Sequence, residues 1–326
     1  MRHRRVPLRV IAWPYAALTV VVIVLWLAQL RHPAAQVLDL ATFWGTVPAV
    51  VLLVVAVLAR DGKATLLLAV PAAVWIWSYG GAFLPSTPPE VGADLRVATF
   101  NTFVGAPDEG HVLALVEQED PDVLLLQEVF PPREEALLAA LGQRYPHHRI
   151  DRSEGVGAVV VMSRHPIVDV IEVGDASDRS RATSVVELDV DGVSLQVVSL
   201  HLISPCPGCG PSLIERLELE DDVRRAEVGA VLEVLDPALP AVVGGDLNSG
   251  DRSSAYRRLV AAGFTDPQRD AGSGMGFTWP ADGQVVPPLV RIDWVLARAL
   301  TAVDARVVAA EGSDHRAVVV DLAIDR

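Results

Sequence analysis

The sequence AVVGGDLNS (Ala241–Ser249) decides the fold class, because an apolar run and two glycines lead directly into polar side chains. A short apolar run bounded by turn-forming residues is typical of a buried strand. Asp246 and Asn248 stand at the end of this run. The stretch therefore predicts a core strand whose end carries side chains suited to catalysis.

The residues after Leu95 repeat this pattern, with short β-branched apolar runs alternating with amphipathic stretches. Such alternation predicts an α/β domain of layered sheets and helices. Two runs adjoin at Asp191 and Gly192, which predicts an antiparallel hairpin within the sheet. We expect strands at 95–101, 122–129, 157–163, 182–190, 193–202, 240–248, 291–297 and 315–324, and helices at 109–119, 133–141, 212–235 and 253–262.

The polar residues that carry chemistry share one placement, at or beside the end of an apolar strand. Side chains at strand ends converge on one edge of a packed sheet, where ligand sites are favoured. A single such residue is more often a surface or capping residue, so the prediction depends on the whole series. The series is Asn101, Glu128, His201, Asp246, Asn248, Asp293, Asp314 and His315.

The N-terminal region has a different composition, dominated by Ala, Val, Leu, Ile and Trp. Its three apolar stretches each approach the roughly 20 residues that cross a bilayer. We expect a transmembrane region over residues 1–84, with spans at about 10–30, 41–59 and 64–84. A cleaved signal peptide before a buried helical domain is the alternative.

Orientation in the cell membrane follows from the basic residues around these stretches. The start MRHRRVPLR and the turn RDGK (Arg60–Lys63) predict a cytoplasmic N-terminus. After three spans the rest of the chain is expected outside the cytoplasm. The Pro-rich residues 85–94 then predict a linker to a domain over residues 95–326.

The domain after the linker is strongly acidic. Residues 91–326 hold 20 of the 27 Lys and Arg residues but 38 of the 41 Asp and Glu residues, a formal charge of −18. Such a domain repels polyanions at long range. The sequence shows no basic patch, so a lipid headgroup or small phosphoester is favoured over nucleic acid as the substrate.

Eight motifs occur in order from about Leu95 to the C-terminus: ATFNTF, LLLQEV, VVVMSRHPI, VSLHL, VVGGDLNS, GFTWP, RIDWVL and SDHRAV. Each motif alone is weak, but the ordered set resembles the endonuclease/exonuclease/phosphatase superfamily. That superfamily includes DNase I-like nucleases, abasic-site endonucleases, sphingomyelinases and inositol phosphatases. Abasic-site endonucleases carry an Asp two residues after the Asn, where this chain has Phe103, and that particular match is therefore weaker.

The resemblance implies a DNase I-like, four-layered α/β sandwich and a divalent cation, usually Mg²⁺, with Mn²⁺ as the alternative. Glu128 would be the main metal ligand, with Asn101 and Asp314 near the metal, and a hard cation prefers such oxygen ligands. By the same resemblance, Asp246 would orient or deprotonate the attacking water. Asn248 would hold the phosphate or the base in line.

Three further side chains are expected to contact the phosphate. His315, backed by the carboxylate of Asp293, and His201 would donate hydrogen bonds to phosphoryl oxygens, since a carboxylate fixes the imidazole tautomer and raises its pKa. The alternative for His201 is a buried core histidine. Arg181 opens a predicted strand, and its planar guanidinium matches a phosphate.

Cys206 and Cys209 form the motif CPGC in the loop after His201. Two cysteines cannot form a four-ligand zinc site, and a thioredoxin-like context is missing. We expect a local disulfide in an oxidising compartment, with free thiols as the alternative.

The expected function is a membrane-anchored, metal-dependent phosphoester hydrolase, a phosphodiesterase or phosphatase. Two alternatives remain at this stage: an extracytoplasmic nuclease acting on DNA or RNA, and a non-catalytic binding scaffold of the same fold. The sequence predicts no oligomeric state.

Overall fold

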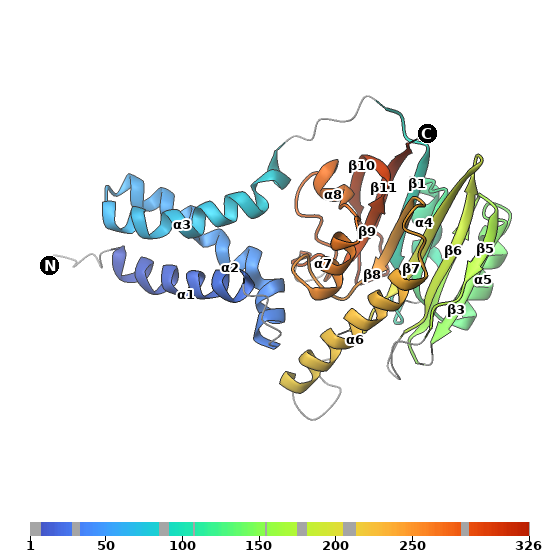
Figure 1. Ribbon diagram of the computed structural model, residues 1–326, viewed down its shortest axis with the longest axis horizontal. Coiled ribbons are helices and arrows are strands. Elements are labelled where there is room, and N and C mark those ends of the chain that lie inside the picture. Colours follow the sequence, from blue (N-terminus) through green and yellow to red (C-terminus); the bar gives the residue numbers. More distant parts are fainter. Residues whose placement is uncertain are drawn as a thin grey trace. The chain divides into compact units, whose positions relative to one another are not determined.

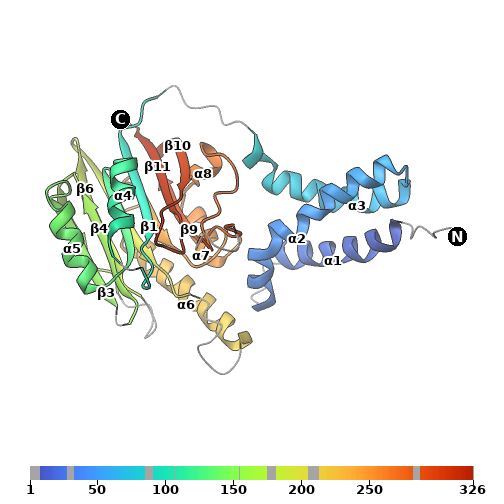
Figure 2. The same cartoon turned by 180° about the vertical axis from the view of Figure 1, so that it is seen from behind.

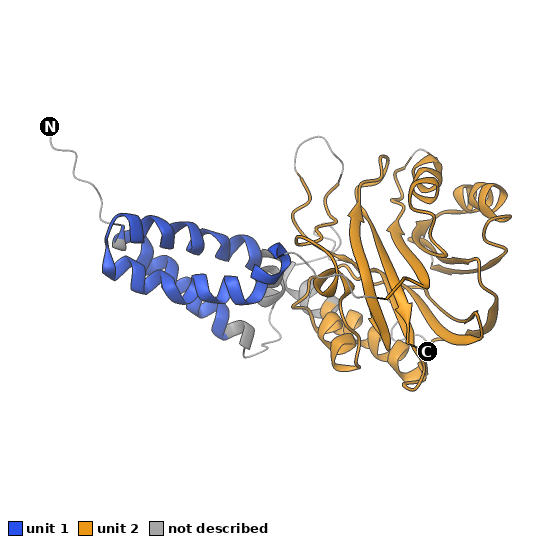
Figure 3. Ribbon diagram, turned by 90° about the horizontal axis from the view of Figure 1, so that it is seen from above, with its two compact units in different colours: residues 1–84 blue, residues 85–326 orange. Residues whose placement is uncertain are grey.

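The computed structural model describes residues 8–27, 33–84, 91–106, 108–153, 155–174, 181–204, 213–281 and 287–325. The chain divides into two compact units, residues 1–84 and 85–326 (Figure 3). In its described part the first unit is helical, and the second holds the strands. The CPGC motif and residues 85–90 of the predicted linker lie outside the described residues.

The described part of the first unit contains three α-helices and one 3-10 helix. Asp61 begins the third helix as an N-cap, because its side chain accepts a hydrogen bond from the Ala64 N–H. Small residues such as Ala56 are buried between the helices, whereas large apolar residues such as Trp77 are exposed. The elements are α1 (Arg9–Leu27), α2 (Pro33–Leu58), α3 (Gly62–Tyr79) and η1 (Gly80–Phe83).

The prediction of three membrane spans is not supported by the described residues, which contain one candidate span. Residues Gly62–Phe83 form a 22-residue segment that is long and apolar enough to cross a membrane. The apolar stretches Val10–Val24 and Thr42–Leu58 are shorter. At about 1.5 Å per residue, 17 helical residues span about 26 Å, less than the roughly 30 Å hydrocarbon core.

The second unit contains two mixed sheets (Figures 1 and 2). The six-stranded sheet has the order β10-β11-β1-β2-β4-β3, and the five-stranded sheet has the order β5-β6-β7-β8-β9. β1 and β2 are parallel, as are β7 and β8, and the other neighbours are antiparallel. The strands are β1 (Leu95–Asn101), β2 (Val123–Val129), β3 (His147–Ser153), β4 (Gly157–Ser163), β5 (Ile167–Ile171), β6 (Thr183–Val190), β7 (Val193–His201), β8 (Ala241–Asp246), β9 (Asp293–Arg298), β10 (Leu300–Val308) and β11 (Ala317–Ile324).

Helices cover the outer faces of both sheets. One apolar cluster fills the space between the two sheets. A second cluster joins α4 and α5 to the six-stranded sheet, and a third joins α6 and α7 to the five-stranded sheet. The α/β prediction with two mixed sheets is therefore confirmed, and the helices add two outer layers. The helices are α4 (Gly110–Glu119), α5 (Pro131–Leu141), α6 (Leu213–Val234), α7 (Ser254–Ala261) and α8 (Pro267–Asp270).

Candidate active site

Three of the predicted site residues lie in one row across the five-stranded sheet. The register aligns His201 of β7 with Asp246 of β8, and Asp246 with Asp293 of β9. Gly245 makes this alignment feasible, because its φ is +146° and a Cβ there would lie 1.9 Å from the Leu200 carbonyl oxygen. Only glycine adopts this backbone without strain. The two glycines before Asp246 thus allow β8 to lie close to its neighbours.

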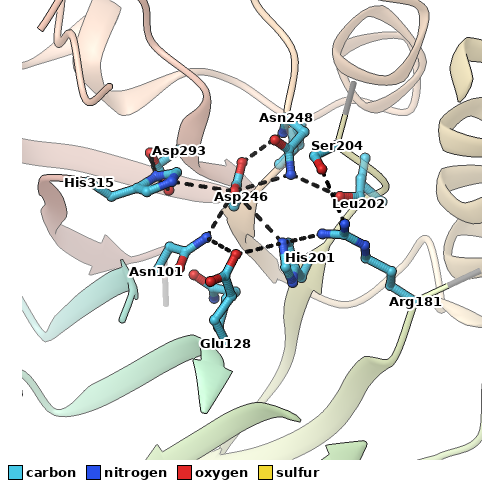
Figure 4. A network of polar contacts seen from close by, with 12 residues as sticks. Asn101, Glu128, Arg181, His201, Leu202, Ser204, Asp246, Asn248, Asp293 and His315 are labelled. Atoms are coloured by element: carbon cyan, nitrogen blue, oxygen red, sulfur yellow. Dashed lines mark hydrogen bonds and ion pairs between the residues drawn. The ribbon is translucent and has the colours of Figure 1, made fainter. Parts of the chain in front are cut away.

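The six-stranded sheet contributes Asn101 and Glu128, which end or nearly end the parallel strands β1 and β2. Glu128 lies at an irregularity in the β2–β4 pairing and has a φ of +58°. Asn101 Nδ2 donates to Glu128 Oε1 at 3.2 Å and to Asp246 Oδ2 at 3.0 Å (Figure 4). One amide therefore connects the polar ends of both sheets.

His315 is held by Asp293 through a short hydrogen bond. Its Nδ1 lies 2.8 Å from Asp293 Oδ2, and both side chains are buried. Burial alone would lower the pKa of His315, but the charge and hydrogen bond of Asp293, with Asp246 and Asp314 nearby, raise it to about 10. His315 is therefore a charged donor at neutral pH.

Asp246 is 1% exposed and accepts several hydrogen bonds. The backbone N–H of Asn248 donates to Oδ1 at 2.8 Å, and Asn248 Nδ2 donates to Oδ2 at 3.2 Å. Burial, together with the charge of Asp293, raises the pKa of Asp246 to about 7. Asn248 Nδ2 also donates to the Leu202 carbonyl at 2.9 Å. Both Nδ2 hydrogens of Asn248 are thus engaged, and the amide holds the base Asp246, which is one of the two alternatives expected for this residue.

Arg181 contacts His201, and this contact defines the state of the imidazole. Arg181 Nη1 donates to His201 Nε2, while Nη2 donates to Ser204 Oγ at 3.2 Å (Figure 4). Burial and the charges of Arg181 and His315 hold the pKa of His201 well below its ordinary value. His201 Nε2 is therefore an acceptor here, which differs from the predicted donor role. Arg181 supplies the N–H groups at this position, and its contact with a phosphate stays a prediction.

The acidic residues of the site fit a divalent cation. When ionised, Glu128, Asp246, Asp293 and Asp314 carry four negative charges, against one positive charge each on Arg181 and His315. The two uncompensated negative charges match one divalent ion. Two of these carboxylates lie near the same imidazole, since His201 Nε2 is 3.7 Å from Glu128 Oε1 and 3.9 Å from Asp246 Oδ2.

The ligand atoms that could hold the cation differ in their availability. Ligand atoms of Asp246, Asp293 and His315 lie within 4.8 Å of one another. His315 Nδ1 is engaged by Asp293 and protonated at neutral pH, so oxygen atoms are the better ligands for a hard cation. Asp314 Oδ1 is buried and has no hydrogen-bond partner among the described residues, which suits a metal ligand.

The side-chain amide of Asn101 has a different orientation from the one expected of a metal ligand. Its Oδ1 accepts the Phe103 N–H at 3.0 Å, which fixes the amide so that Nδ2 faces the carboxylates of Glu128 and Asp246. Asn101 therefore links two acidic side chains, and Glu128, Asp246 and Asp314 supply the oxygens suited to a cation.

Two other residues near the site escaped the sequence prediction. Arg133 Nη1 donates to the carbonyls of Thr102 and Phe103, and its Nη2 donates to the Ala106 carbonyl. This arginine thereby holds the loop that follows Asn101. A lone arginine in the first turn of a helix gives no sequence signal of such a role.

The other residue is Trp279, which lies in the motif GFTWP. Its Nε1 donates to Asp314 Oδ2 at 3.3 Å, and its side chain is 40% exposed. The adjacent Thr278 is buried and accepts the Asp293 N–H at its Oγ1. A tryptophan in a loop is usually packing, so only the contact with Asp314 reveals this position.

Comparison with known proteins agrees with this geometry. The sequence profile of the Endonuclease/Exonuclease/phosphatase family matches residues 98–315, which contain every residue of the site. The chain belongs to this family. Its members are generally hydrolases that act on phosphoester bonds, and they typically depend on a divalent metal. No curated protein matches the chain.

Solved structures are similar to this chain over about 70% of its length. An endonuclease/exonuclease/phosphatase from Beutenbergia cavernae is 25% identical, with a TM-score of 0.55 and 71% of each chain covered. A family protein from Bacteroides vulgatus is 18% identical, with a TM-score of 0.57, over 71% of this chain and 99% of the other. A humanized D. rerio TDP2 is 16% identical, with a TM-score of 0.55, over 70% and 98%. The last two likenesses show the fold alone.

Proposed function

We propose that this family member is a membrane-anchored, Mg²⁺-dependent phosphodiesterase or phosphatase that acts on a lipid headgroup or a small phosphoester. The observation that carries the catalytic part is the network in which Asn101 joins Glu128 and Asp246 beside the Asp293–His315 pair. Hydrolysis needs a proton acceptor for water and positive charge against the phosphoryl oxygens. The network offers both.

Each residue has a defined task in this proposal. Asp246 accepts a proton from the attacking water, and its raised pKa of about 7 suits a base near neutral pH. The new P–O bond forms as the ester P–O bond breaks. His315 and Arg181 donate hydrogen bonds to the phosphoryl oxygens, where negative charge develops. A divalent cation held by Glu128 and Asp314 would supply further stabilisation of that charge.

The membrane anchor is proposed for the first unit. Its support is the apolar segment Gly62–Phe83 and the exposure of large apolar side chains such as Leu58, Leu66 and Trp77. An exposed apolar surface of this extent is unfavourable in water. The basic N-terminus further favours an extracytoplasmic second unit. An anchored enzyme encounters lipid headgroups at high effective concentration.

The experiment that tests the catalytic proposal uses the full chain in lipid nanodiscs with Mg²⁺. Phospholipids, sphingomyelin, inositol phosphates, RNA and DNA are offered separately, and the released products are quantified. We expect turnover of a lipid or small phosphoester, abolished by EDTA and reduced at least 100-fold by Asp246→Asn. Turnover of nucleic acid alone would refute the proposed substrate class. If the folded, Mg²⁺-loaded protein turns over none of these substrates, the result would favour a non-catalytic binding scaffold of the same fold.

A separate experiment tests the anchor. Membranes that contain the full chain are extracted with alkaline carbonate, and a chain of residues 91–326 serves as the control. We expect only the full chain to remain in the membrane after carbonate extraction. We also expect protease added outside the cell to cleave the second unit. Release of the full chain by carbonate would contradict the anchor.

A further inference from the structure

A cavity of about 400 Å³ lies beside β10, outside the row of catalytic residues. Met275, Phe277, Pro288, Arg306 and Arg316 line it, and no Asp or Glu is among its described lining residues. Ligand pockets in proteins span roughly 300–1,000 Å³. In a domain with a formal charge of −18, a cavity with two arginines and no acid is suited to an anion.

The two arginines of the cavity differ in how far their charges are neutralised. Arg306 is ion-paired with Glu119 at 2.7 Å, with Asp304 at 2.7 Å and with Asp321 at 3.3 Å. Arg316 is half-buried and forms no ion pair with any residue that the structure describes. Arg316 therefore provides the uncompensated positive charge of the cavity.

The segment that carries Arg316 also carries two residues of the catalytic site, and backbone hydrogen bonds join it to the loop at Thr278 and Ala281. The Arg316 N–H donates to the Thr278 carbonyl at 2.9 Å, and the Ala281 N–H donates to the Asp314 carbonyl at 2.7 Å. Arg316 lies two residues after Asp314 and directly after His315, whose Nδ1 contacts Asp293.

We propose that the cavity around Arg316 is a substrate subsite for a second anionic group, a phosphate or a carboxylate, on the part of the phosphoester that is not cleaved. This inference rests on the proposed function and narrows its substrate class. The planar guanidinium forms paired hydrogen bonds with either anion. Phe277 and Met275 would contact the carbon skeleton that connects the two anionic groups.

The test compares two soluble ligands that differ by one phosphate, propyl phosphate and propane-1,3-diyl bisphosphate. Both are titrated calorimetrically into the full chain with Mg²⁺, as wild type and as Arg316→Gln. We expect the bisphosphate to bind wild type about tenfold or more tightly than the monophosphate, because charge-assisted hydrogen bonds are strong. Arg316→Gln should lose this preference, and Arg316→Lys should keep part of it. Thermal unfolding verifies that each variant is folded.

Arg225→Gln is the matched control, since it removes one positive charge from a surface ion pair with Asp222 on α6. It should keep the full preference for the bisphosphate. Equal binding of the two ligands to wild type, or a preference that survives in Arg316→Gln, would overturn the subsite.

Two activity measurements accompany the titration. Hydrolysis of bis(4-nitrophenyl) phosphate by wild type tests the proposed function separately, because this ester has no second anion. Nanodiscs with phosphatidylserine or phosphatidylethanolamine, which differ by one carboxylate, identify the source of the second anion. Faster cleavage of phosphatidylserine would show that the second anionic group belongs to a lipid headgroup. Equal cleavage rates for the two lipids, with the preference for the bisphosphate retained, would show that it belongs to a soluble substrate.

Discussion

Asp293 Oδ2 lies 2.8 Å from His315 Nδ1, and neither side chain has appreciable contact with solvent. The pair joins strand β9 to the segment just before β11, residues that are 22 positions apart in sequence. A buried carboxylate at this distance keeps the imidazole charged and fixes its orientation. The charged imidazole can then stabilise phosphoryl oxygens.

Replacing Asp293 with Asn should lower both the pKa of His315 and the activity. Without the charge and hydrogen bond of this carboxylate, burial of the imidazole should lower the pKa of His315 well below its value of about 10. We expect a loss of about 10²–10⁴ in kcat at pH 8. NMR titration of the imidazole measures the pKa, and an unchanged pKa would contradict this description of the pair.

The same pair predicts a pH dependence of stability. Because the folded pKa of His315 lies above the ordinary 6.5, its stabilising effect is complete below about pH 6.5 and is lost as the pH rises through about 10. The difference in Tm between wild type and Asp293→Asn should therefore shrink over this interval. Calorimetry in EDTA measures the two Tm values at each pH. A Tm difference that grows with pH would contradict the raised pKa of His315.

Mg²⁺ should stabilise the fold more at pH 8 than at pH 5. The pKa of Asp246 is raised from 3.8 to about 7, so the metal-free fold loses stability as the pH rises across this interval. A divalent cation offsets the ionised carboxylates and adds about 2.7 kcal/mol at 100 times its Kd. Differential scanning calorimetry with MgCl₂, against KCl of equal ionic strength, provides the measurement. Equal effects of the two salts would refute a specific cation site.

Arg133→Gln should weaken Mg²⁺ binding, because Arg133 holds the loop whose Val104 N–H donates to Glu128 Oε2 at 2.8 Å. We expect a several-fold higher Mg²⁺ concentration for half-maximal activity and a destabilisation of about 2–4 kcal/mol. Arg152→Gln is the control, since it removes a more exposed arginine paired with Glu134. An unchanged Mg²⁺ dependence in Arg133→Gln would limit this arginine to a structural role.

Gly245→Ala should disrupt the edge of the sheet that carries the site. The added Cβ would meet the Leu200 carbonyl oxygen at 1.9 Å, at a φ that is unfavourable for alanine. We expect a destabilisation above about 3 kcal/mol or failure to fold. Gly92→Ala is the control, because no atom lies within 4 Å of its added Cβ. Chemical denaturation measures both, and equal stabilities would contradict the close approach of β7 and β8.

The central strands and one edge strand, β9, could be predicted from sequence, whereas three other edge strands could not. Every predicted strand is present, and the Asp191-Gly192 hairpin is confirmed, with both residues at positive φ. The missed strands β3, β5 and β10 all lie at sheet edges. Edge strands bury less apolar surface, so their sequences, such as HHRIDRS in β3, lack a strong apolar pattern.

The members of the site were easier to predict than their orientations. Strand ends identify Asn101 and Asp246 as members of one site, although the two residues end strands of different sheets. Which atom of Asn101 faces Asp246 depends on the Phe103 N–H, a contact set by the backbone of the following loop. The acceptor state of His201 likewise depends on Arg181, which is 20 residues away. Local sequence patterns do not encode such contacts.

The most direct test of the account is the rate of 4-nitrophenolate release from bis(4-nitrophenyl) phosphate by the full chain, measured against Mg²⁺ concentration. Wild type should show saturable Mg²⁺-dependent hydrolysis, and Asp246→Asn and His315→Gln should each reduce kcat at least 100-fold while remaining folded. Hydrolysis that is independent of Mg²⁺, or that survives in both variants, would contradict the assignment of this network as the catalytic site.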